Sequence, residues 1–450
     1  MKTISINREL KHHDFEKDQN GVCRASQAKL TEDSTRLIHW SLKNGAKIVM
    51  ASIPDTPLTC LDLWCRAGSA FENPGEEGLA HFLEHMVFKG SSSLEAGEFD
   101  LQIEALGGSS NAATGFDDVH FYVLVPSKSA LQALELLLNL VLTPKIDQEA
   151  FCLEREVVLE EIAQYKDQPD EQAFQKLLES CWPQHPYGRS ILGKEASLQR
   201  LNPAQMRAFH RQHYTGENCC LAISGSIPKG IDHVLKKSLL AKLPKKATER
   251  NNAIQSPSLG FCKGRKEIII PRLETARLMI AWQLSPAKDQ KMIMGADIAT
   301  SLLAEGRRSR LVKHLRENLQ LVECVDMDLT VLEQGSLVML EALCKEDQLE
   351  NVEQEISKVL KETISSPIRE KEIQRSYCLV RNGMYFNLEA ACHVANQAGS
   401  QSLWDRDHSL LDPLKHIPYW NSKTLQENIL GILQPSQGFT LIARPSGNQI

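Results

Sequence analysis

Alternating apolar and polar residues predict several short strands, and longer segments with helical periodicity lie between them. Gly107-Gly108 is placed to end one of these helices, and Pro144 follows the end of another. Asp147 is placed to cap the next helix, which we expect to run to about Tyr165. This combination of strands and helices predicts an α+β fold. The predicted strands are 46–52, 60–65 and 119–125, and the predicted helices are 79–88, 98–106 and 129–142.

The order of these elements recurs in the second half of the chain. The segment 61–67 resembles 278–284 at an offset of 217 residues (278 − 61), and the helix near Leu131 resembles the helix near Leu349 at 218 (349 − 131). The matching offsets predict two homologous halves, each a mixed or antiparallel sheet with helices packed on one side. We expect an N-terminal arm 1–33, a first domain 34–241, a linker 242–263 and a second domain 264–450.

The composition narrows the class of protein. The chain has 450 residues, of which 42% are hydrophobic and 24% charged, as in soluble globular proteins of two domains. A net charge of −6 argues against a nucleic-acid partner. The most apolar run, 131–142, is too short for a membrane span. Twelve cysteines without C-x-x-C spacing indicate reduced thiols. With no apolar signal segment at 1–20, we expect a cytoplasmic protein, with an organellar matrix or stroma as the alternative.

One short motif carries chemistry. The segment 81–85 reads H-x-x-E-H, so His81 and His85 lie one turn apart on the same face of a predicted helix. Two imidazoles with this spacing can bind one zinc ion, and Glu84 can stand beside the ion as a general base. The alternative is a solvated helix face that happens to carry two histidines.

A catalytic zinc site requires a third protein ligand. Acidic residues follow on the predicted helix that starts after Asp147. Glu154 and Glu161 are seven residues apart and share a face, but position alone does not separate Glu161 from Glu160. The apolar residues of this helix that we expect to seat it in the core are Val157, Val158 and Ile162.

These motifs resemble the pitrilysin/insulinase family of zinc metallopeptidases, also called inverzincins, in the branch of the processing peptidases and their bacterial relatives. The segment 78–90, G-L-A-H-F-L-E-H-M-V-F-K-G, carries the most specific match, and E-R-x-V-V-x-E-E-I at 154–162 adds to it. Similarity extends from about residue 35 to the end of the chain. Further matching positions are Asn111 to Thr114, Asp117, Tyr122, His185 to Gly188, Tyr214 to Asn218, Ser309 to Leu311 and Leu315 to Glu317.

The resemblance implies a zinc-dependent endopeptidase (a hydrolase) that cleaves peptides or unfolded, presequence-like segments. It implies Glu161 as the third zinc ligand and Glu154 as a carboxylate that orients a ligand histidine. It also implies a substrate chamber enclosed with a partner subunit, and an edge strand that pairs with an extended peptide. The residues of that strand are Asn111, Ala112, Ala113 and Thr114.

The second half lacks the zinc motif. The repeat offset places Ile298, Ser301 and Leu302 opposite the H-x-x-E-H residues, so we expect one zinc per chain. The resemblance implies a supporting catalytic role for Arg316, but Glu323 stands where relatives carry a tyrosine, and Gln320 where they carry a glycine. We therefore expect a heterodimer in which a homologous subunit supplies the Arg/Tyr pair. A homodimer is the alternative, and the alternative function is a non-catalytic assembly subunit.

Overall fold

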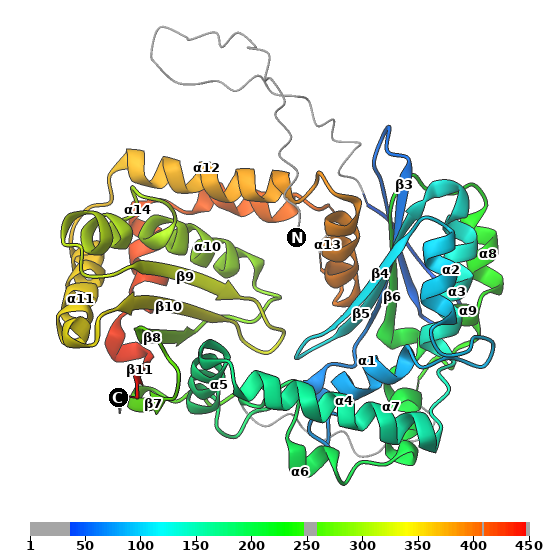
Figure 1. Ribbon diagram of the computed structural model, residues 1–450. Helices are drawn as coiled ribbons and strands as arrows, with labels where there is room; N and C mark the ends of the chain where they lie inside the picture. The colour runs from blue at the N-terminus through cyan, green and yellow to red at the C-terminus, as the bar shows by residue number, and fades with distance from the viewer. Residues whose placement is uncertain (1–36, 247–258, 407–408, 447–450) are drawn as a thin grey trace, which may run out of the picture.

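The first half of the chain forms a six-stranded sheet. The structure is a computed structural model that describes residues 37–246, 259–406 and 409–446 (Figure 1). The strand order is β1-β2-β6-β3-β5-β4, with β2 and β6 parallel and all other neighbours antiparallel. The edge strand β4 carries the N-A-A-T segment. The strands are β1 (Ile38–Ser41), β2 (Lys47–Ser52), β3 (Leu58–Cys65), β4 (Ser109–Thr114), β5 (Val119–Pro126) and β6 (Cys219–Gly225).

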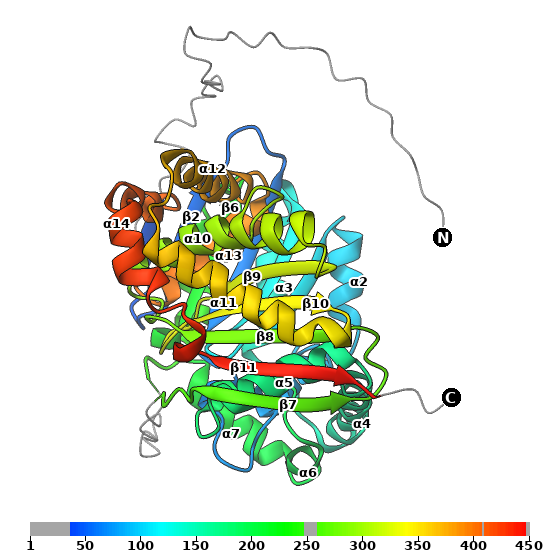
Figure 2. The same ribbon diagram turned by 90° about the vertical axis from the view of Figure 1, so that its left-hand side faces the viewer.

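The second half repeats this sheet without a counterpart of β1. Its order, β7-β11-β8-β10-β9, matches β2-β6-β3-β5-β4, and its one parallel pair, β7 and β11, matches β2 and β6. Figure 2 shows these five strands side by side. The matching strand orders confirm the predicted duplication. That prediction was based on the spacing of the elements and not on sequence identity between the halves. The strands are β7 (Gly264–Ile270), β8 (Ala276–Gln283), β9 (Cys324–Thr330), β10 (Leu337–Cys344) and β11 (Phe439–Pro445).

Helices of the first half cover one face of its sheet and enclose the main core. Asp147 caps α4 by accepting from the N–H of Ala150 at 2.9 Å, as the sequence predicts. The prediction that Val157 helps to seat α4 was wrong: its exposed fraction is 51%. The inward positions of α4 are Phe151, Glu154, Val158 and Ile162, and Val157 points about 100° away from Val158. The helices are α1 (Leu79–Val87), α2 (Glu98–Ala105), α3 (Ala130–Leu142), α4 (Gln148–Lys166), α5 (Pro169–Cys181), α6 (Glu195–Leu198), α7 (Pro203–His213), α8 (Ile231–Lys237) and α9 (Leu239–Lys242).

The helices of the second half follow a related order. α10 occupies the place of α1 in the repeat, and α11 that of α3. Across the described part of the chain, no helix is both long enough and apolar enough to cross a lipid bilayer. The helices are α10 (Gln290–Ala304), a π-helical segment (Val312–Asn318), α11 (Leu349–Ser365), α12 (Glu370–Phe386), α13 (Ala391–Leu403) and α14 (Ser422–Leu425).

The two halves exchange one helix each. α13, from the second half, packs on β2, β3 and β6 of the first sheet, where Ala395 and Ala398 join the cluster around Trp64 (Figure 1). α5, from the first half, packs on β7, β8 and β11, where Leu177 joins the cluster around Leu441. Each sheet therefore has its own helices on one face and one helix of the other half on the opposite face. This exchange ties the halves together by apolar burial.

Hydrogen bonds also join the halves at the turn between β4 and β5. Asp117, in that turn, accepts a hydrogen bond from the hydroxyl of Tyr187 at 2.6 Å and from the backbone N–H of Glu333 at 3.0 Å. The same Tyr187 hydroxyl accepts a hydrogen bond from the N–H of Gln334 at 3.1 Å. The turn that follows the edge strand is thus fixed by the second half.

Candidate metal centre and active site

The zinc-motif helix α1 begins at a capped turn. Gly78 has φ +96°, and a Cβ there would lie 2.6 Å from the carbonyl oxygen of Leu192, so the turn requires glycine. The buried carboxylate of Glu72 accepts hydrogen bonds from the N–H groups of Gly78 (3.1 Å) and Ala80 (2.8 Å). Glu72 therefore satisfies two donors that a helix N-terminus leaves free. Apolar residues of α1, among them Phe82 and Leu83, bury its inner side.

α4 lies beside α1 and carries the acidic residues. Phe82 of α1 meets Phe151 of α4 with ring centroids 4.6 Å apart, which fixes the two helices against each other. Glu154 is buried, while the side chain of Glu161 is 42% exposed. Glu160, which position alone did not separate from Glu161, is exposed and outside the ligand cluster.

His81, His85 and Glu161 come together at the junction of these helices. Their ligand atoms all lie within 4.8 Å of one another, and they are the only such group among the described residues. Oε2 of Glu161 lies 3.4 Å from Nε2 of His85 and 3.8 Å from Nε2 of His81. Ligands of a tetrahedral zinc ion with bonds of 2.0–2.1 Å are about 3.4 Å apart. The cluster is therefore close to the size that zinc requires.

The partners of His85 hold its ring in an orientation that suits metal binding. Nδ1 of His85 lies 2.9 Å from Oε1 of Glu154 and donates a hydrogen bond to that carboxylate. Its other nitrogen, Nε2, faces Oε2 of Glu161 at 3.4 Å. A proton or a metal ion between Nε2 and this carboxylate makes the contact favourable. Lys89 holds the other oxygen of Glu154 at 2.8 Å.

His81 supplies the more buried of the two imidazoles. Burial, together with a smaller contribution from the neighbouring His85, lowers the pKa of His81 to about 4. The ring is neutral at physiological pH, which is the form that binds a metal. Its Nδ1 is buried without a hydrogen-bond partner among the described residues. Two imidazoles and one carboxylate form a donor set typical of catalytic zinc sites.

Glu84 stands beside this cluster without belonging to it. The hydroxyl of Thr114, on the edge strand β4, donates a hydrogen bond to Oε2 of Glu84. Burial raises the pKa of Glu84 above its ordinary value, and the hydrogen bond from Thr114 opposes that shift. A carboxylate with a raised pKa next to three metal-binding groups is suited to accept and return a proton.

The edge strand that the sequence predicts lies directly against α1. β4 is the last strand of the sheet and pairs with β5 alone among the described strands, so its outer backbone groups are open to an added strand. Oδ1 of Asn111 accepts from the N–H of Ala112 at 2.9 Å. Ala113 faces the opposite side of the sheet from Thr114. The structure thus gives Thr114 a contact with Glu84 in addition to its place on the strand.

The sequence analysis did not predict a pair of ionisable residues, Asp62 and His120, that lies near the edge strand β4. Asp62, on β3, is 1% exposed, and its Oδ1 lies 3.0 Å from Nδ1 of His120 on β5. His120 is the strand neighbour of Ala113, and its ring stacks on Trp64 with centroids 4.2 Å apart. A carboxylate within the apolar strand 60–65 was the available signal, because a buried charge requires a partner.

No residue of the second half, within its described part, belongs to the candidate metal-binding cluster. Ile298, Ser301 and Leu302 are buried within α10, as expected for a half without ligands. Arg316, in the π-helical segment, engages its neighbour Glu317 at 2.9 Å, and no described hydrogen bond or ion pair links it to the cluster. Glu323 lies just before β9 and donates its backbone N–H to the carbonyl of Leu343.

Family comparison agrees with this arrangement. Residues 47–195 match the model of the insulinase family (peptidase family M16), and residues 200–376 match the model described as the peptidase M16 inactive domain. The chain belongs to peptidase family M16. The first match contains the complete metal-binding cluster, and the second covers most of the half without it.

M16 relatives resemble the chain over most of its length. An "Uncharacterized zinc protease" of Rickettsia bellii is 27% identical over 358 residues, covering 80% of this chain and 85% of that protein. The "Uncharacterized zinc protease YmxG" of Bacillus subtilis is 25% identical over 412 residues, covering 91% and 98%. The names of these M16 relatives associate the family match with zinc and proteolysis.

Solved structures share the M16 fold. A protease from Helicobacter pylori has a TM-score of 0.83 at 22% identity and covers 91% of this chain and 100% of that chain. A structure of a peptidase M16 inactive domain from Pseudomonas fluorescens has a TM-score of 0.81 at 19% identity, covering 92% and 99%. At sequence identities of 22% and 19%, the similarity to these structures concerns the fold alone. The aligned regions cover more than nine-tenths of this chain.

Proposed function

We propose that this chain is a zinc-dependent endopeptidase, with zinc held by His81, His85 and Glu161 and with Glu84 as general base. The observation that supports this most directly is the convergence of three ligand atoms within 4.8 Å beside a carboxylate outside the set. Nε2 of His85 adds support, because it faces Oε2 of Glu161 at 3.4 Å and is placed to bind the same ion as that carboxylate. Zinc in such a site supplies Lewis-acid chemistry and lowers the pKa of water.

The residues around the site would have three further roles: orienting a ligand, transferring a proton and positioning the base. Glu154, braced by Lys89, holds His85 in one tautomer and one ring orientation. Glu84 takes a proton from the attacking water and returns it to the leaving amine. Thr114 holds the carboxylate of Glu84 in place from the strand on which a peptide would lie.

The edge strand β4 favours an extended peptide as substrate. Backbone pairing gives affinity with little demand on side chains, which suits peptides and unfolded or presequence-like segments. The exposed side chains of Leu153 and Val157 lie two turns and one turn, respectively, before Glu161 on α4 and offer apolar contacts along the same helix.

A comparison of the wild type with Glu84→Gln and Glu161→Gln tests this function. We expect the wild type to cleave unfolded peptides in a chelator-sensitive manner. Glu84→Gln should keep its zinc and lose hydrolysis, whereas Glu161→Gln should lose zinc, as measured by metal analysis after dialysis. Hydrolysis by Glu84→Gln would overturn the assignment of the base. A zinc-loaded wild type that cleaves no peptide, alone or with a partner, would favour the non-catalytic assembly subunit.

We further propose that a homologous subunit completes the active site. By the family resemblance, Glu323 takes the place of a tyrosine that donates a hydrogen bond to the oxyanion, and an ionised carboxylate there would repel that charge. Arg316 would serve as the supporting group of this half. Native mass measurement after purification from the source cell would detect a second chain, and addition of that chain should raise peptidase activity. Full activity of the isolated chain would favour the homodimer instead.

A further inference from the structure

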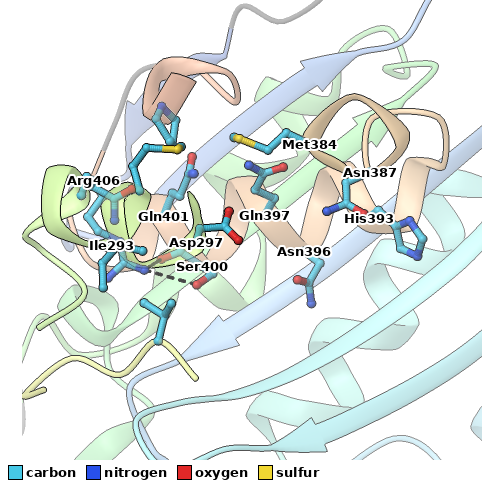
Figure 3. Close-up of a pocket in the computed structure, with 14 residues that line it drawn as sticks. Ile293, Asp297, Met384, Asn387, His393, Asn396, Gln397, Ser400, Gln401 and Arg406 are labelled. Carbon is cyan, nitrogen blue, oxygen red and sulfur yellow. Dashed lines mark hydrogen bonds between the residues drawn. The ribbon is translucent and has the colours of Figure 1, made fainter. Parts of the chain in front are cut away.

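A cavity lies away from the candidate metal-binding cluster, among α10, α12 and α13. It measures about 480 Å³ and is lined by side chains of all three helices (Figure 3). In Figure 1 these helices lie on the upper side of the molecule, whereas α1 and α4 run along the lower side. None of the residues of the zinc motif lines it. The metal site therefore does not explain the polar side chains that line this cavity.

Three side chains in this cavity offer hydrogen-bond acceptors without partners. Asp297 of α10 has a carboxylate with no hydrogen bond or ion pair within the described part of the chain. On α13, Gln397 and Gln401 lie one turn apart, and Oε1 of each is buried without a partner among the described residues. Gln401 is 8% exposed. Figure 3 shows these three side chains among those that line the cavity.

The orientation of one amide is set by its surroundings. Nε2 of Gln397 donates to the carbonyl of Leu410 at 3.1 Å, so Oε1 must be the atom that remains free. Two buried acceptors of this kind are costly unless a donor reaches them. They indicate that the cavity is built for a group rich in N–H donors.

Arg406, a positively charged side chain in the cavity wall, does not supply N–H donors to these acceptors. Arg406 lines the cavity, but its guanidinium pairs with Glu333 and lies 3.4 Å from the hydroxyl of Ser400. His393 also faces the cavity and has no described ion pair. Burial, with a smaller contribution from Glu305, raises the pKa of Asp297 to about 6, so the carboxyl group is still mostly ionised at neutral pH. Among the described residues that line the cavity, no cation pairs with this carboxylate.

We propose that this cavity binds a primary ammonium or guanidinium group on an aliphatic chain, as carried by a lysine or arginine side chain or by the amino terminus of a peptide. The cation would pair with Asp297 and donate to Gln397 and Gln401. Apolar wall residues, Ile293 and Met384 among them, would contact the aliphatic part. As a statement about peptide substrates this rests on the proposed function, and it gives that function an anchor for positive charge away from the scissile bond.

Peptide binding to the Glu84→Gln chain tests the proposal without hydrolysis. Two labelled, Nα-acetylated peptides differ only by arginine against the isosteric, neutral citrulline, and a third has citrulline with a free amino terminus. By fluorescence anisotropy at low salt, we expect the arginine peptide to bind about five- to tenfold more tightly than the acetylated citrulline peptide. Asp297→Asn should remove this ratio and leave the citrulline affinity unchanged. Glu350→Gln, at an exposed carboxylate of α11, is the matched control and should preserve the ratio.

The third peptide identifies the source of the cation. A gain from the free amino terminus that Asp297→Asn removes would assign the cavity to the terminus, and a gain from arginine alone would assign it to a side chain. A ratio that survives Asp297→Asn, or no ratio at all, would overturn the proposal. Because binding is measured in a variant without the base, this outcome is independent of whether the wild type hydrolyses peptides.

A small-molecule ligand tests the cavity in variants that no longer bind peptides for other reasons. Agmatine, a guanidinium on an aliphatic chain, should raise the melting temperature of the wild type but not that of Asp297→Asn. Calcium chloride and sodium chloride at equal ionic strength separate this effect from binding of an inorganic cation. Stabilisation by either salt that depends on Asp297, without any by agmatine, would overturn the proposal.

Discussion

The hydroxyl of Thr114 donates a hydrogen bond to the carboxylate of Glu84, and this contact joins the edge strand β4 to the zinc-motif helix α1. The strand on which a peptide would lie and the proposed base are therefore held in one arrangement. A peptide that pairs with β4 would meet Glu84 at a fixed place, because the base is attached to the same strand.

Thr114→Val should lower kcat/KM for peptide hydrolysis by about tenfold, because the carboxylate of Glu84 loses the donor that holds it. Zinc content should not change, since Thr114 contacts no ligand. Thr114→Ser keeps the hydroxyl and should retain most of the activity. Steady-state kinetics with one peptide and metal analysis on the three proteins provide the check. Equal kcat/KM in wild type and Thr114→Val would show that this contact has no role in hydrolysis.

Glu154→Gln should weaken zinc binding by about 10- to 100-fold, because the amide is a poorer acceptor for Nδ1 of His85 and a poorer partner for Lys89. Competition against a chromogenic chelator measures the change. Glu156→Gln is the matched control on the same helix, since the side chain of Glu156 is 71% exposed, and its affinity should equal that of the wild type. Equal affinities in all three proteins would remove Glu154 from the metal site.

The sequence was most informative where local geometry decides the outcome. H-x-x-E-H places His81 and His85 on one face of any helix that forms there, so their proximity follows from the helical repeat. The caps at Gly107 and Asp147 follow equally from local backbone preferences. The repeat offset was also informative, because both halves keep the same spacing between strands.

Contacts between distant elements could not be predicted in this way. The choice of Glu161 over Glu160 depends on how α4 is rotated against α1, and the same rotation exposes Val157. The pair formed by Thr114 and Glu84 depends on the packing of a helix on a sheet edge. The exchange of α5 and α13 was equally inaccessible, since an amphipathic pattern shows that a face is buried but not which sheet covers it.

Glu72 should make stability depend on pH. Burial raises the pKa of its carboxyl group to about 8, although the N–H groups of Ala80 and Gly78 favour the charged form. The folded-state pKa lies above the ordinary value of 4.5, so the stabilising contribution is complete below pH 4.5, declines as pH rises above it and is lost above about 8. Glu72→Gln is neutral throughout and should lack this decline.

Urea unfolding of zinc-depleted wild type and Glu72→Gln, at about pH 5.5 and about pH 8.5, measures the effect. The free energy of unfolding of the wild type should fall relative to that of the variant as pH rises. Glu95→Gln, at a surface carboxylate that is 84% exposed, should follow the wild type. A wild-type stability that rises relative to Glu72→Gln over this interval would mean that Glu72 is ionised in the folded state.

Tyr187→Phe should loosen the junction between the halves. The variant loses the donor to Asp117 and the acceptor for the N–H of Gln334, both within a region where Tyr187 is fully buried. We expect a loss of about 1–3 kcal/mol in the free energy of unfolding, because a buried carboxylate and a backbone N–H each lose a partner. Hydrogen exchange should increase in the turn 115–118 and around Gln334. Tyr419→Phe, at a 43% exposed tyrosine, is the matched control and should change neither quantity. If exchange in the turn 115–118 is unchanged while global stability falls, Tyr187 stabilises its own half and does not couple the two, and the position of the edge strand is then set by the first sheet alone.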